Sequence, residues 1–469
     1  MEKRTHIKNT VESVGSIVTV MGWVDSRRDH GSLIFLDIRD STGIVQAVVS
    51  PKSEDAYSHA KHIREEWVLK ITGAVKKRPD AMVNDDIATG TVEMQVTTLE
   101  VLGVSKTPPF PLHTDGLDID EESRLRYRFI DLRRQRMQNN IRLRSEFIHR
   151  VRSLLFDNDF VEIETPLLTQ STPEGARDFV VPSRLQPGSF YALPQSPQQY
   201  KQLLMVAGFE RYFQIARCLR DEDLRADRAF EHSQIDMEMS FMDEEAIRAF
   251  DEDLITRVYE AMGATIKEKP FPVFSYQEAM EQFGADKFDL RTEEEKREGI
   301  LAFAWVVDFP FFEKKDDGKW TFTHNPFSMP KHEHIDFVLE EKRLDEVVAH
   351  QYDLVCNGYE IGSGSIRSHH PNITRSVFSI LGYTEEHIEE QFGHMLEAFS
   401  FGAPPHGGIA HGIERLMMLI TNEQYLREVQ AFPQTSSGRT AVMNAPAPLS
   451  HDQLDELKVN VNTEDEKER

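Results

Sequence analysis

Two runs of alternating apolar and polar residues flank a strongly charged segment near the middle of the chain. The first run covers residues 212–220 and the second covers residues 234–241. In the second run three apolar residues alternate with three polar ones: Ile235, Met237 and Met239 against Gln234, Asp236 and Glu238. A period of two puts successive side chains on opposite faces of a strand. The pattern predicts a long antiparallel hairpin with one apolar and one polar face.

The segment that joins the two runs is crowded with charges of both signs. Residues 217–231 contain four arginines and five acids, which is too much charge for a core element. Ion pairs on a solvated hairpin would explain this composition. A site for a polyanionic ligand would also explain it, because the fork of an arginine side chain binds phosphate or carboxylate through two hydrogen bonds. Both interpretations stay open on the charge pattern alone.

The first hundred residues have the alternation of strands. The predicted strands cover residues 17–24, 33–39, 44–49, 67–75 and 92–102, with one helix over residues 53–66. Thr42 and Gly43 fit a tight turn between the second and third strands. Five strands with a helix after the third follow the order of an OB-fold, a small barrel that binds oligonucleotides on one face.

The second predicted strand places an aromatic side chain among charges. Phe35 shares a face with Asp37 and Arg39, whereas the alternate isoleucine and leucine residues would fill the barrel core. An aromatic ring on a charged face is a platform on which a nucleic-acid base can stack. Packing of the ring on a neighbouring strand is the alternative explanation.

A proline-rich segment separates these strands from a longer second part of the chain. Three prolines between residues 108 and 111 stiffen a linker that we place at residues 106–125. Residues 136–158 carry apolar side chains at helical spacing, which predicts one long amphipathic helix. Residues 160–166, Phe-Val-Glu-Ile-Glu-Thr-Pro, follow as a predicted strand that ends at a proline.

Composition and charge narrow the class of protein. The chain has 469 residues and an apolar content of 39%, which suits a globular protein of two or three domains. Its two cysteines, Cys218 and Cys356, argue against a disulfide framework and against a cysteine-based zinc site. We find no signal peptide or membrane span, so a cytoplasmic protein is expected. Residues 1–105 carry 13 basic and 15 acidic residues, so most of the net charge of −25 lies elsewhere.

Several segments, taken together and in order, resemble one enzyme family. Residues 219–222, Leu-Arg-Asp-Glu, resemble motif 2 of the class II aminoacyl-tRNA synthetases, and the run through Asp236 resembles the aspartyl-tRNA synthetases of bacterial type. Residues 160–166 resemble motif 1, and residues 407–416 resemble motif 3. Further segments similar to this family cover residues 172–179, 193–204 and 357–367.

The resemblance implies a fold class and a domain order. The expected fold is an α+β catalytic domain with an antiparallel sheet, the class II synthetase core, preceded by an N-terminal all-β OB-fold. The two domains would cover residues 1–105 and 126–469. The inserted domain of the bacterial type is missing near residues 292–300, where a short charged run stands instead. An insertion between surface points is expendable, so the core should survive its loss.

The resemblance also implies the chemistry of adenylate formation, in which a carboxylate attacks the α-phosphate of ATP and Mg²⁺ assists. Arg220, Glu222 and Arg415 take the catalytic positions, and Glu360 is the implied metal ligand. Arg220 would bridge the two reacting anions, while Arg415, near a helix N-terminus, would hold the γ-phosphate. The implied ATP-binding residues are Arg220, Asp221, Glu222, His232, Glu360, Gly412, Ile413, Glu414 and Arg415.

The implied amino-acid substrate is L-aspartate. The residues matched to its pocket are Glu174, Ser196, Gln198, Lys201, Arg220, Asp236, His324 and Arg367. Arg367 and Lys201 would bind the side-chain carboxylate, since a guanidinium matches a planar carboxylate. Two positions depart from the bacterial pattern: Ala229 replaces a glutamine and Asn325 replaces a histidine, so side-chain contacts there are in doubt.

The OB-fold would bind the anticodon of tRNA(Asp) through Arg28, His30, Phe35, Gln46 and Glu93. Strictly aspartate-specific members of the bacterial family tend to carry leucine at the position of His30, and relaxed members tend to carry histidine. An imidazole both donates and accepts hydrogen bonds, so it can satisfy either of two base edges. We therefore expect tRNA(Asn) as a second substrate, and contact of His30 with backbone phosphate alone is the alternative. Met82, near the second discriminating position, matches neither pattern.

Motif 1 implies a homodimer.

Two kinds of alternative to an aspartyl-tRNA synthetase remain. Asparaginyl- or lysyl-tRNA synthetases, or a tRNA-independent asparagine synthetase, would share the same core, but Arg367 with Lys201 favours a substrate with a carboxylate side chain. A non-catalytic RNA-binding protein on this scaffold is the second alternative. The intact set of Arg220, Glu222, Glu360 and Arg415 argues against it.

Overall fold

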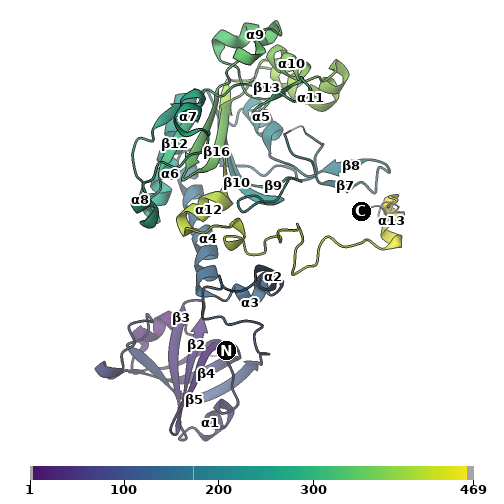
Figure 1. The fold of residues 1–469 in the computed structure, drawn as a ribbon. Helices are drawn as coiled ribbons and strands as arrows, with labels where there is room; N and C mark the ends of the chain where they lie inside the picture. Colours follow the sequence, from purple (N-terminus) through teal and green to yellow (C-terminus); the bar gives the residue numbers. More distant parts are fainter. Residues whose placement is uncertain (1–3, 173, 462–469) are drawn as a thin grey trace. The chain divides into compact units, whose positions relative to one another are not determined.

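The computed structural model describes residues 4–172 and 174–461, and the chain forms two compact units, Met1–Ile119 and Asp120–Arg469 (Figure 1). The division at residue 119 falls inside the segment that we assigned to the linker. Each unit has a hydrophobic core of its own. Among the described residues, no helix is long and apolar enough to cross a membrane.

The first unit is a closed barrel in the strand order β1-β2-β3-β5-β4. Its strands are β1 (Ile17–His30), β2 (Leu33–Asp40), β3 (Gly43–Val49), β4 (Val68–Lys77) and β5 (Val92–Gly103). Burial alternates along β2, so Ile34, Leu36 and Ile38 fill the core while Phe35 stays half-buried on the outer face. The barrel confirms the predicted strand order and its predicted inner face.

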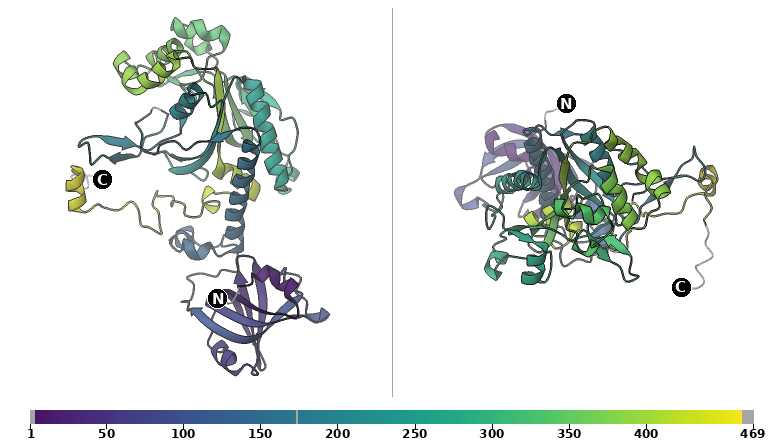
Figure 2. Two further views of the ribbon diagram at one scale, coloured as in Figure 1. Left: turned by 180° about the vertical axis from the view of Figure 1, so that it is seen from behind. Right: turned by 90° about the horizontal axis from the view of Figure 1, so that it is seen from above.

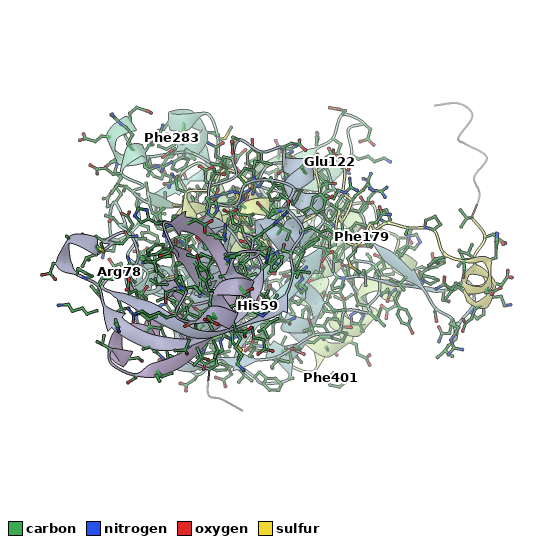
Figure 3. All side chains as sticks on the ribbon, turned by 90° about the horizontal axis from the view of Figure 1, so that it is seen from below. His59, Arg78, Glu122, Phe179, Phe283 and Phe401 are labelled. Carbon is green, nitrogen blue, oxygen red and sulfur yellow. The ribbon has the colours of Figure 1, made fainter. Side chains whose placement is uncertain are left out.

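The helix of the barrel is shorter than we predicted from residues 53–66. Helix α1 covers only Glu54–Ala60, and it carries His59, which is labelled in Figure 3. The backbone of Glu66 has a positive φ of 65°, and its N–H donates to the carbonyl of Val24 at 2.7 Å. The residues after Ala60 therefore lead into β4 instead of continuing the helix, so the predicted helix was too long.

The second unit is organised around an eight-stranded sheet in the order β11-β12-β15-β16-β17-β10-β9-β6. The strands are β6 (Val161–Glu162), β9 (Arg211–Leu219), β10 (Glu231–Ser240), β11 (Val273–Ser275), β12 (Phe303–Val307), β15 (Gln351–Cys356), β16 (Tyr359–Ile366) and β17 (His406–Gly412). The six central strands pair antiparallel, as predicted, but β6 and β11 join the two edges in parallel. The sheet is therefore mixed at its edges.

The predicted hairpin is the centre of this sheet. Strands β9 and β10 pair from Arg211–Met239 to Leu219–Glu231, and β10 also pairs with β17. Ile235, Met237 and Met239 pack into the main core, as their alternation predicts. The predicted strand at residues 160–166 is reduced to the two residues of β6, because the backbone N–H of Thr165 bonds to the side chain of Gln214 at 3.2 Å rather than to a strand.

Helices cover the sheet and extend from it (Figures 1 and 2). They are α2 (Glu121–Arg126), α3 (Arg128–Asp131), α4 (Gln135–Phe156), α5 (Gln198–Val206), α6 (Glu244–Ala261), α7 (Tyr276–Phe283), α8 (Glu293–Arg297), α9 (Ile335–Leu339), α10 (Pro371–Ile380), α11 (Glu385–Ser400), α12 (Ile413–Thr421) and α13 (His451–Leu457). Helix α4 is the predicted long helix, and its Phe147, Val151 and Leu155 are fully buried in the main core.

Short elements complete the second unit. The pairs β7 (Val180–Pro182) with β8 (Phe190–Ala192) and β13 (Phe312–Lys314) with β14 (Trp320–Phe322) form two small hairpins. Where we predicted a missing insertion, the chain makes helix α8, which begins with a capping box at Thr292 and Glu295. Figure 2 shows α13 beside the β7–β8 hairpin, where Arg184 and Glu456 lie 3.6 Å apart.

Candidate active site

A cavity of about 300 Å³ lies over the polar face of the central hairpin. Its walls come from β10, β16, β17, the start of α5, the loop between β9 and β10, and the start of α12. Six of its basic side chains are Lys201, Arg220, Arg228, Lys287, Arg367 and Arg415. Six of its acidic side chains are Glu174, Glu222, Asp227, Asp236, Glu360 and Glu414. This balance suits a ligand that carries several charges of both signs.

The cavity brings together most of the residues that we predicted for a catalytic site. Those that line it are Glu174, Ser196, Gln198, Lys201, Arg220, Glu222, His232, Asp236, His324, Glu360, Arg367, Gly412, Glu414 and Arg415. Asp221 and Ile413 do not line it. The Asp221 carboxylate lies 3.3 Å from the Arg177 guanidinium, and Ile413 is fully buried in the main core. Their side chains therefore lie outside the cavity lining, and a contact of either residue with ATP stays a prediction.

Two buried cations form one end of the cavity, and two buried acids hold them there. Arg367 donates from Nε and Nη2 to the two carboxylate oxygens of Glu238, at 2.9 and 3.2 Å. Lys201 Nζ lies 2.9 Å from Asp236 Oδ2 and 3.4 Å from Glu238 Oε2. Burial raises the pKa of Glu238, but Arg367 and Lys201 outweigh it, so its pKa lies below the usual value. Buried carboxylates thus fix both side chains at the cavity wall.

Hydrogen-bond acceptors gather beside these cations. Asp236 Oδ1 is buried and has no hydrogen-bond partner, while Oδ2 of the same carboxylate is held by Lys201. Ser196 Oγ donates to Glu174, and burial raises the pKa of that glutamate. A buried oxygen without a donor costs free energy unless a ligand supplies the donor. The region around Asp236 is therefore suited to a bound ammonium group.

Arg220 projects from the charged loop and keeps most of its donors available. Its Nε donates to the carbonyl of Gln195 at 3.4 Å, and no carboxylate of the described residues lies within ion-pair distance of it. The rest of the loop is tied down by Arg228 to Glu222, at 3.5 Å, and by Arg415 to Asp227, at 3.1 Å. The loop thus aims one unpaired guanidinium into the cavity, as a bound anion requires.

A segment that comes earlier in the chain also contacts this loop. Phe179, labelled in Figure 3, packs edge-on against Phe230 with ring centroids 5.4 Å apart. Gln195 Nε2 donates to Asp178 at 2.6 Å and to the Ala176 carbonyl at 2.8 Å. Residues 174–179 therefore pack against the charged loop, and Glu174 in this segment lines the cavity.

His232 lines the cavity as a neutral ring. Burial lowers its pKa to about 3, and the neighbouring charges of Arg220, Arg415 and Arg217 act in the same direction. A neutral imidazole presents a flat aromatic face without a charge, which is the property that stacking on a purine needs. Ala229 and Asn325 also line the cavity, and Asn325 Oδ1 accepts a hydrogen bond from the Phe327 N–H at 2.8 Å.

Of two neighbouring carboxylates, Glu360 lines the cavity and Asp353 is buried without lining it. Lys287 Nζ lies 2.7 Å from Glu360 Oε2. Asp353 Oδ2 is buried without a hydrogen-bond partner, and burial together with the nearby Glu360 charge raises the pKa of Asp353 to about 6. Among the described residues no group of three or more His, Cys, Asp or Glu could hold a metal ion. Magnesium in phosphate sites takes only one or two protein carboxylates, so Asp353 and Glu360 fit it.

The predicted residues of the barrel also lie together, on one outer face of that unit. Asp37 pairs with Gln46 across β2 and β3, and Gln46 pairs with Glu93 across β3 and β5. Arg28 Nη2 lies 2.8 Å from Asp37 Oδ2 and 3.5 Å from Gln46 Oε1. Phe35 stands opposite Arg28 in the β1–β2 register, and His30 is exposed at the end of β1. The face is polar, open and built around one aromatic ring.

Sequence reasoning missed several residues of the cavity. Gln234 and Lys287 line the cavity, and the buried Glu238 and Asp353 interact with residues that line it, but none of the four was assigned to the site. A signal for two of them was present, since Gln234 and Glu238 share the polar strand face with Asp236. Asp353 is an acid inside a strand that is otherwise largely apolar, which also marks a buried special position.

Comparison with known proteins shows the family to which the sequence of this chain is similar. A family model described as tRNA synthetases class II (D, K and N) matches residues 120–436, and an OB-fold nucleic acid binding domain model matches residues 18–102. An aspartate–tRNA(Asp/Asn) ligase of Rubrobacter xylanophilus is 40% identical over 584 aligned positions, covering 98% of this chain and 97% of the relative. An aspartate–tRNA ligase of Bacillus licheniformis is 38% identical and covers 96% and 97%.

The alignment with the Rubrobacter relative is 584 positions long, whereas the chain has 469 residues. More than a hundred positions of the relative therefore lie opposite gaps in this chain.

Solved structures are similar in fold. Asparaginyl-tRNA synthetase from Pyrococcus horikoshii in complex with asparaginyl-adenylate has a TM-score of 0.74 at 24% identity, covering 93% of this chain and 99% of that one. An aspartyl-tRNA synthetase from Entamoeba histolytica has a TM-score of 0.73 at 22% identity, covering 92% and 91%. At these identities the likeness concerns the fold, in both of its units.

Proposed function

The chain belongs to the class II tRNA synthetases of the D, K and N group, and from that premise we propose that it is an ATP-dependent ligase that activates L-aspartate and transfers it to the 3′ end of tRNA(Asp). The observation that carries the choice of aspartate is the pair of fixed cations, Arg367 and Lys201, beside the unpartnered oxygen of Asp236. Cations face the side-chain carboxylate, and the acceptor faces the ammonium.

Arg220 is placed to serve the bond-forming step. An oxygen of the substrate α-carboxylate attacks the α-phosphorus of ATP, the bond from that phosphorus to the bridging oxygen breaks, and diphosphate leaves. Both reacting groups are anions, so the free guanidinium of Arg220 can hold them together and stabilise the added charge. In the second step a ribose hydroxyl at the tRNA 3′ end attacks the aspartyl carbonyl, and AMP leaves.

The ATP side of the cavity is assigned by charge and shape. His232 offers a neutral ring for the adenine, and Glu222 offers an acceptor for its amino group. Arg415 stands in the first turn of α12, where a helix N-terminus also favours phosphate, and we place the γ-phosphate there. The main-chain groups around Gly412 and Glu414 complete this end.

Glu360 and Asp353 are the residues that would hold Mg²⁺. The ion would supply positive charge to the phosphate oxygens and to the leaving diphosphate. The unpartnered oxygen of Asp353 supports this assignment, because a buried carboxylate oxygen without a donor suits a cation.

Aspartate is favoured over asparagine by the same buried charges. An amide in place of the side-chain carboxylate would leave the buried side chains of Arg367 and Lys201 facing a neutral group. Gln198, Ser196 and Glu174 would share the ammonium with Asp236, and His324 borders the same region. The solved relative with asparaginyl-adenylate shares the fold alone, at 24% identity.

The polar face of the barrel is the proposed anticodon site. Arg28, Phe35, Gln46 and Glu93 form one connected surface, with Phe35 as the base platform. His30 stands exposed at its edge and is our reason to include tRNA(Asn) as a second substrate. Seven of eight curated relatives that are 38–40% identical to this chain carry the name aspartate–tRNA(Asp/Asn) ligase.

We also propose a homodimer in the cytoplasm. Strand β6 is an edge strand, and Val161, Phe156, Leu167 and Leu168 near it are 41–54% exposed, which is a large apolar surface for one region. A second copy that pairs at this edge would cover it. Sedimentation analysis should show a species near twice 54.0 kDa, and an active monomer at assay concentration would contradict the dimer.

The amino-acid substrate can be tested in one experiment. Amino-acid-dependent exchange of labelled diphosphate into ATP is measured with each of the twenty amino acids and with no RNA present. Aspartate alone should support rapid exchange. Rapid exchange with asparagine or lysine instead would identify another member of the same group, and no exchange with any amino acid would indicate a non-catalytic protein.

A further inference from the structure

A row of three buried side chains continues from the cavity wall into the protein behind it. Gln198 and Gln202 lie one turn apart on α5, so both face β17, where His406 begins the strand. Gln198 is 4% exposed, and Gln202 and His406 are fully buried. Gln198 lines the cavity, whereas the other two residues do not reach it.

Hydrogen bonds connect the three side chains in one unbroken line. Gln198 Nε2 donates to Gln202 Oε1 at 3.0 Å, and Gln202 Nε2 lies 3.2 Å from His406 Nε2. At the far end, His406 Nδ1 lies 2.8 Å from the carbonyl oxygen of Pro404. Each side chain in this line can either donate or accept, but the Pro404 carbonyl can only accept.

That carbonyl therefore fixes the direction of every bond in the line. His406 must carry its hydrogen on Nδ1, and burial lowers the pKa of His406, so the ring is neutral and its Nε2 is an acceptor. Gln202 must then turn its NH₂ group to His406 and its carbonyl to Gln198. Gln198 must turn its NH₂ group to Gln202, which leaves its carbonyl oxygen toward the cavity.

We propose that His406 and Gln202 are positioning residues that hold the Gln198 amide with its oxygen toward the substrate ammonium. This inference rests on the proposed aspartate ligase activity. The Gln198 oxygen and the unpartnered Asp236 Oδ1 then offer two acceptors to the three donors of the ammonium. In the reverse orientation the Gln198 NH₂ would face the ammonium, and two carbonyl oxygens would face each other at Gln202.

The hydrogen-bonded line of Gln198, Gln202 and His406 is called the relay below. The experiment compares variants of the relay with a matched control on the same helix. Gln202→Met keeps the length of the side chain but removes both amide groups, so Gln198 can rotate. Gln199→Met is the control, because Gln199 is also buried, at 8% exposed, and does not line the cavity. His406→Phe breaks the relay at its other end with a ring of similar size. Circular dichroism and melting curves confirm that each variant is folded.

Two ligands separate the ammonium site from the rest of the pocket. Aspartate carries two carboxylates and an ammonium, whereas succinate carries the two carboxylates alone. We expect Gln202→Met to raise the KM for aspartate in diphosphate exchange by about tenfold to a hundredfold, since the lost bond is to a charged donor. The inhibition constant of succinate and the KM for ATP should stay within about twofold of wild type. His406→Phe should give the same selective change, but smaller, because Gln202 still bonds to Gln198 in either orientation.

The outcomes distinguish this inference from the function on which it rests. If the wild type shows no aspartate-dependent exchange, the proposed function fails. If the wild type is active and Gln202→Met binds aspartate as tightly as Gln199→Met does, the relay has no positioning role. Equal losses for aspartate and succinate would also overturn the inference, since they would mean general damage to the pocket. The ¹⁵N signals of His406 are assigned by their absence from His406→Phe. In the protein without substrate they should show a neutral ring protonated at Nδ1. Protonation at Nε2 would reverse the direction of every hydrogen bond in the relay and so contradict the inference.

Discussion

The cavity of the second unit and the polar face of the barrel are built in the same way but stand in different surroundings. In both, charged side chains from alternate positions of neighbouring strands form a connected surface. In the cavity, Lys201, Asp236 and Arg367 are at most 2% exposed. On the barrel, the Arg28 side chain is 59% exposed and its partner Asp37 is 18% exposed.

This difference in burial determines what each region can do. A buried ion pair is rigid, and removal of one partner leaves a charge without compensation, at a cost of about 3–5 kcal/mol. An exposed ion pair is screened by water and contributes roughly 0–1 kcal/mol. We therefore expect the cavity to make large, substrate-specific contributions, and the barrel to contribute mainly through Phe35 and only when tRNA is present.

The largest effect should come from Arg220→Ala. This guanidinium is the free cation that can contact both reacting anions, and a contact that strengthens in the transition state is worth about 3 kcal/mol or more, roughly a hundredfold in rate. Aspartate-dependent diphosphate exchange should fall by at least that factor in a folded variant. Exchange at the wild-type rate would show that the chemistry takes place elsewhere.

A second large effect is expected for Arg367→Leu, and it should affect both selectivity and stability. The substitution removes the partner of Glu238 and the fork that faces the substrate carboxylate, so preference for aspartate over asparagine should largely disappear. The melting temperature should also fall, because a buried glutamate is left with Lys201 alone. Arg375→Leu is the control, since Arg375 on α10 pairs with two exposed acids of α11, Glu385 and Glu389. Unchanged selectivity in Arg367→Leu would remove this residue from the pocket.

A smaller effect is expected at the edge of the barrel. His30→Leu should reduce aspartylation of tRNA(Asn) by several-fold to about tenfold, in line with the loss of one hydrogen bond to a base. Aspartylation of tRNA(Asp) should change little. The measurement is kcat/KM with each purified tRNA. If the wild type charges tRNA(Asn) orders of magnitude more slowly than tRNA(Asp), the enzyme discriminates strictly and His30 has another role.

The smallest effect on activity is expected for His232→Phe. The ring of His232 is already neutral, because its pKa lies near 3, so phenylalanine should stack on adenine about as well, and the KM for ATP should change by less than about threefold. A pKa lowered in the folded state means that unfolding takes up a proton below the ordinary value of 6.5. The free energy of unfolding of the wild type should therefore fall from pH 6.5 toward pH 3 by an amount that His232→Phe lacks. Identical pH profiles would contradict a ring that is neutral in the folded protein.

The elements that could be predicted are those with a local signal. Alternation alone located β9 and β10, the five barrel strands and the face that carries Asp236, because the period of a strand is visible within a few residues. The limits of α1 and β6 were wrong, because bonds to Val24 and to the side chain of Gln214 decide them, and neither bond has a local signal. Parallel pairing at the two sheet edges has the same cause.

In the candidate site, too, features with a local sequence signal could be predicted and features that depend on distant contacts could not. The motif residues indicated a chemistry for the cavity but not the direction of each side chain, so they did not show that the side chains of Asp221 and Ile413 lie outside its lining. Arg367 and Glu238 are 129 residues apart, and His406 and Gln202 are 204 apart. Only the tertiary fold brings such pairs together, so their role in holding the pocket could not be predicted from spacing.

The central claim is that the two regions act in separate steps, and Phe35→Ala tests it most directly. Diphosphate exchange with aspartate and aminoacylation of tRNA(Asp) are measured on the same preparation, with Gln46→Ala and Glu93→Ala alongside. Loss of a stacked base is worth about 1–3 kcal/mol. Aminoacylation kcat/KM should therefore fall by about fivefold to a hundredfold in Phe35→Ala, while exchange stays within about twofold of wild type. Equal loss in both reactions would contradict the separation of the two regions.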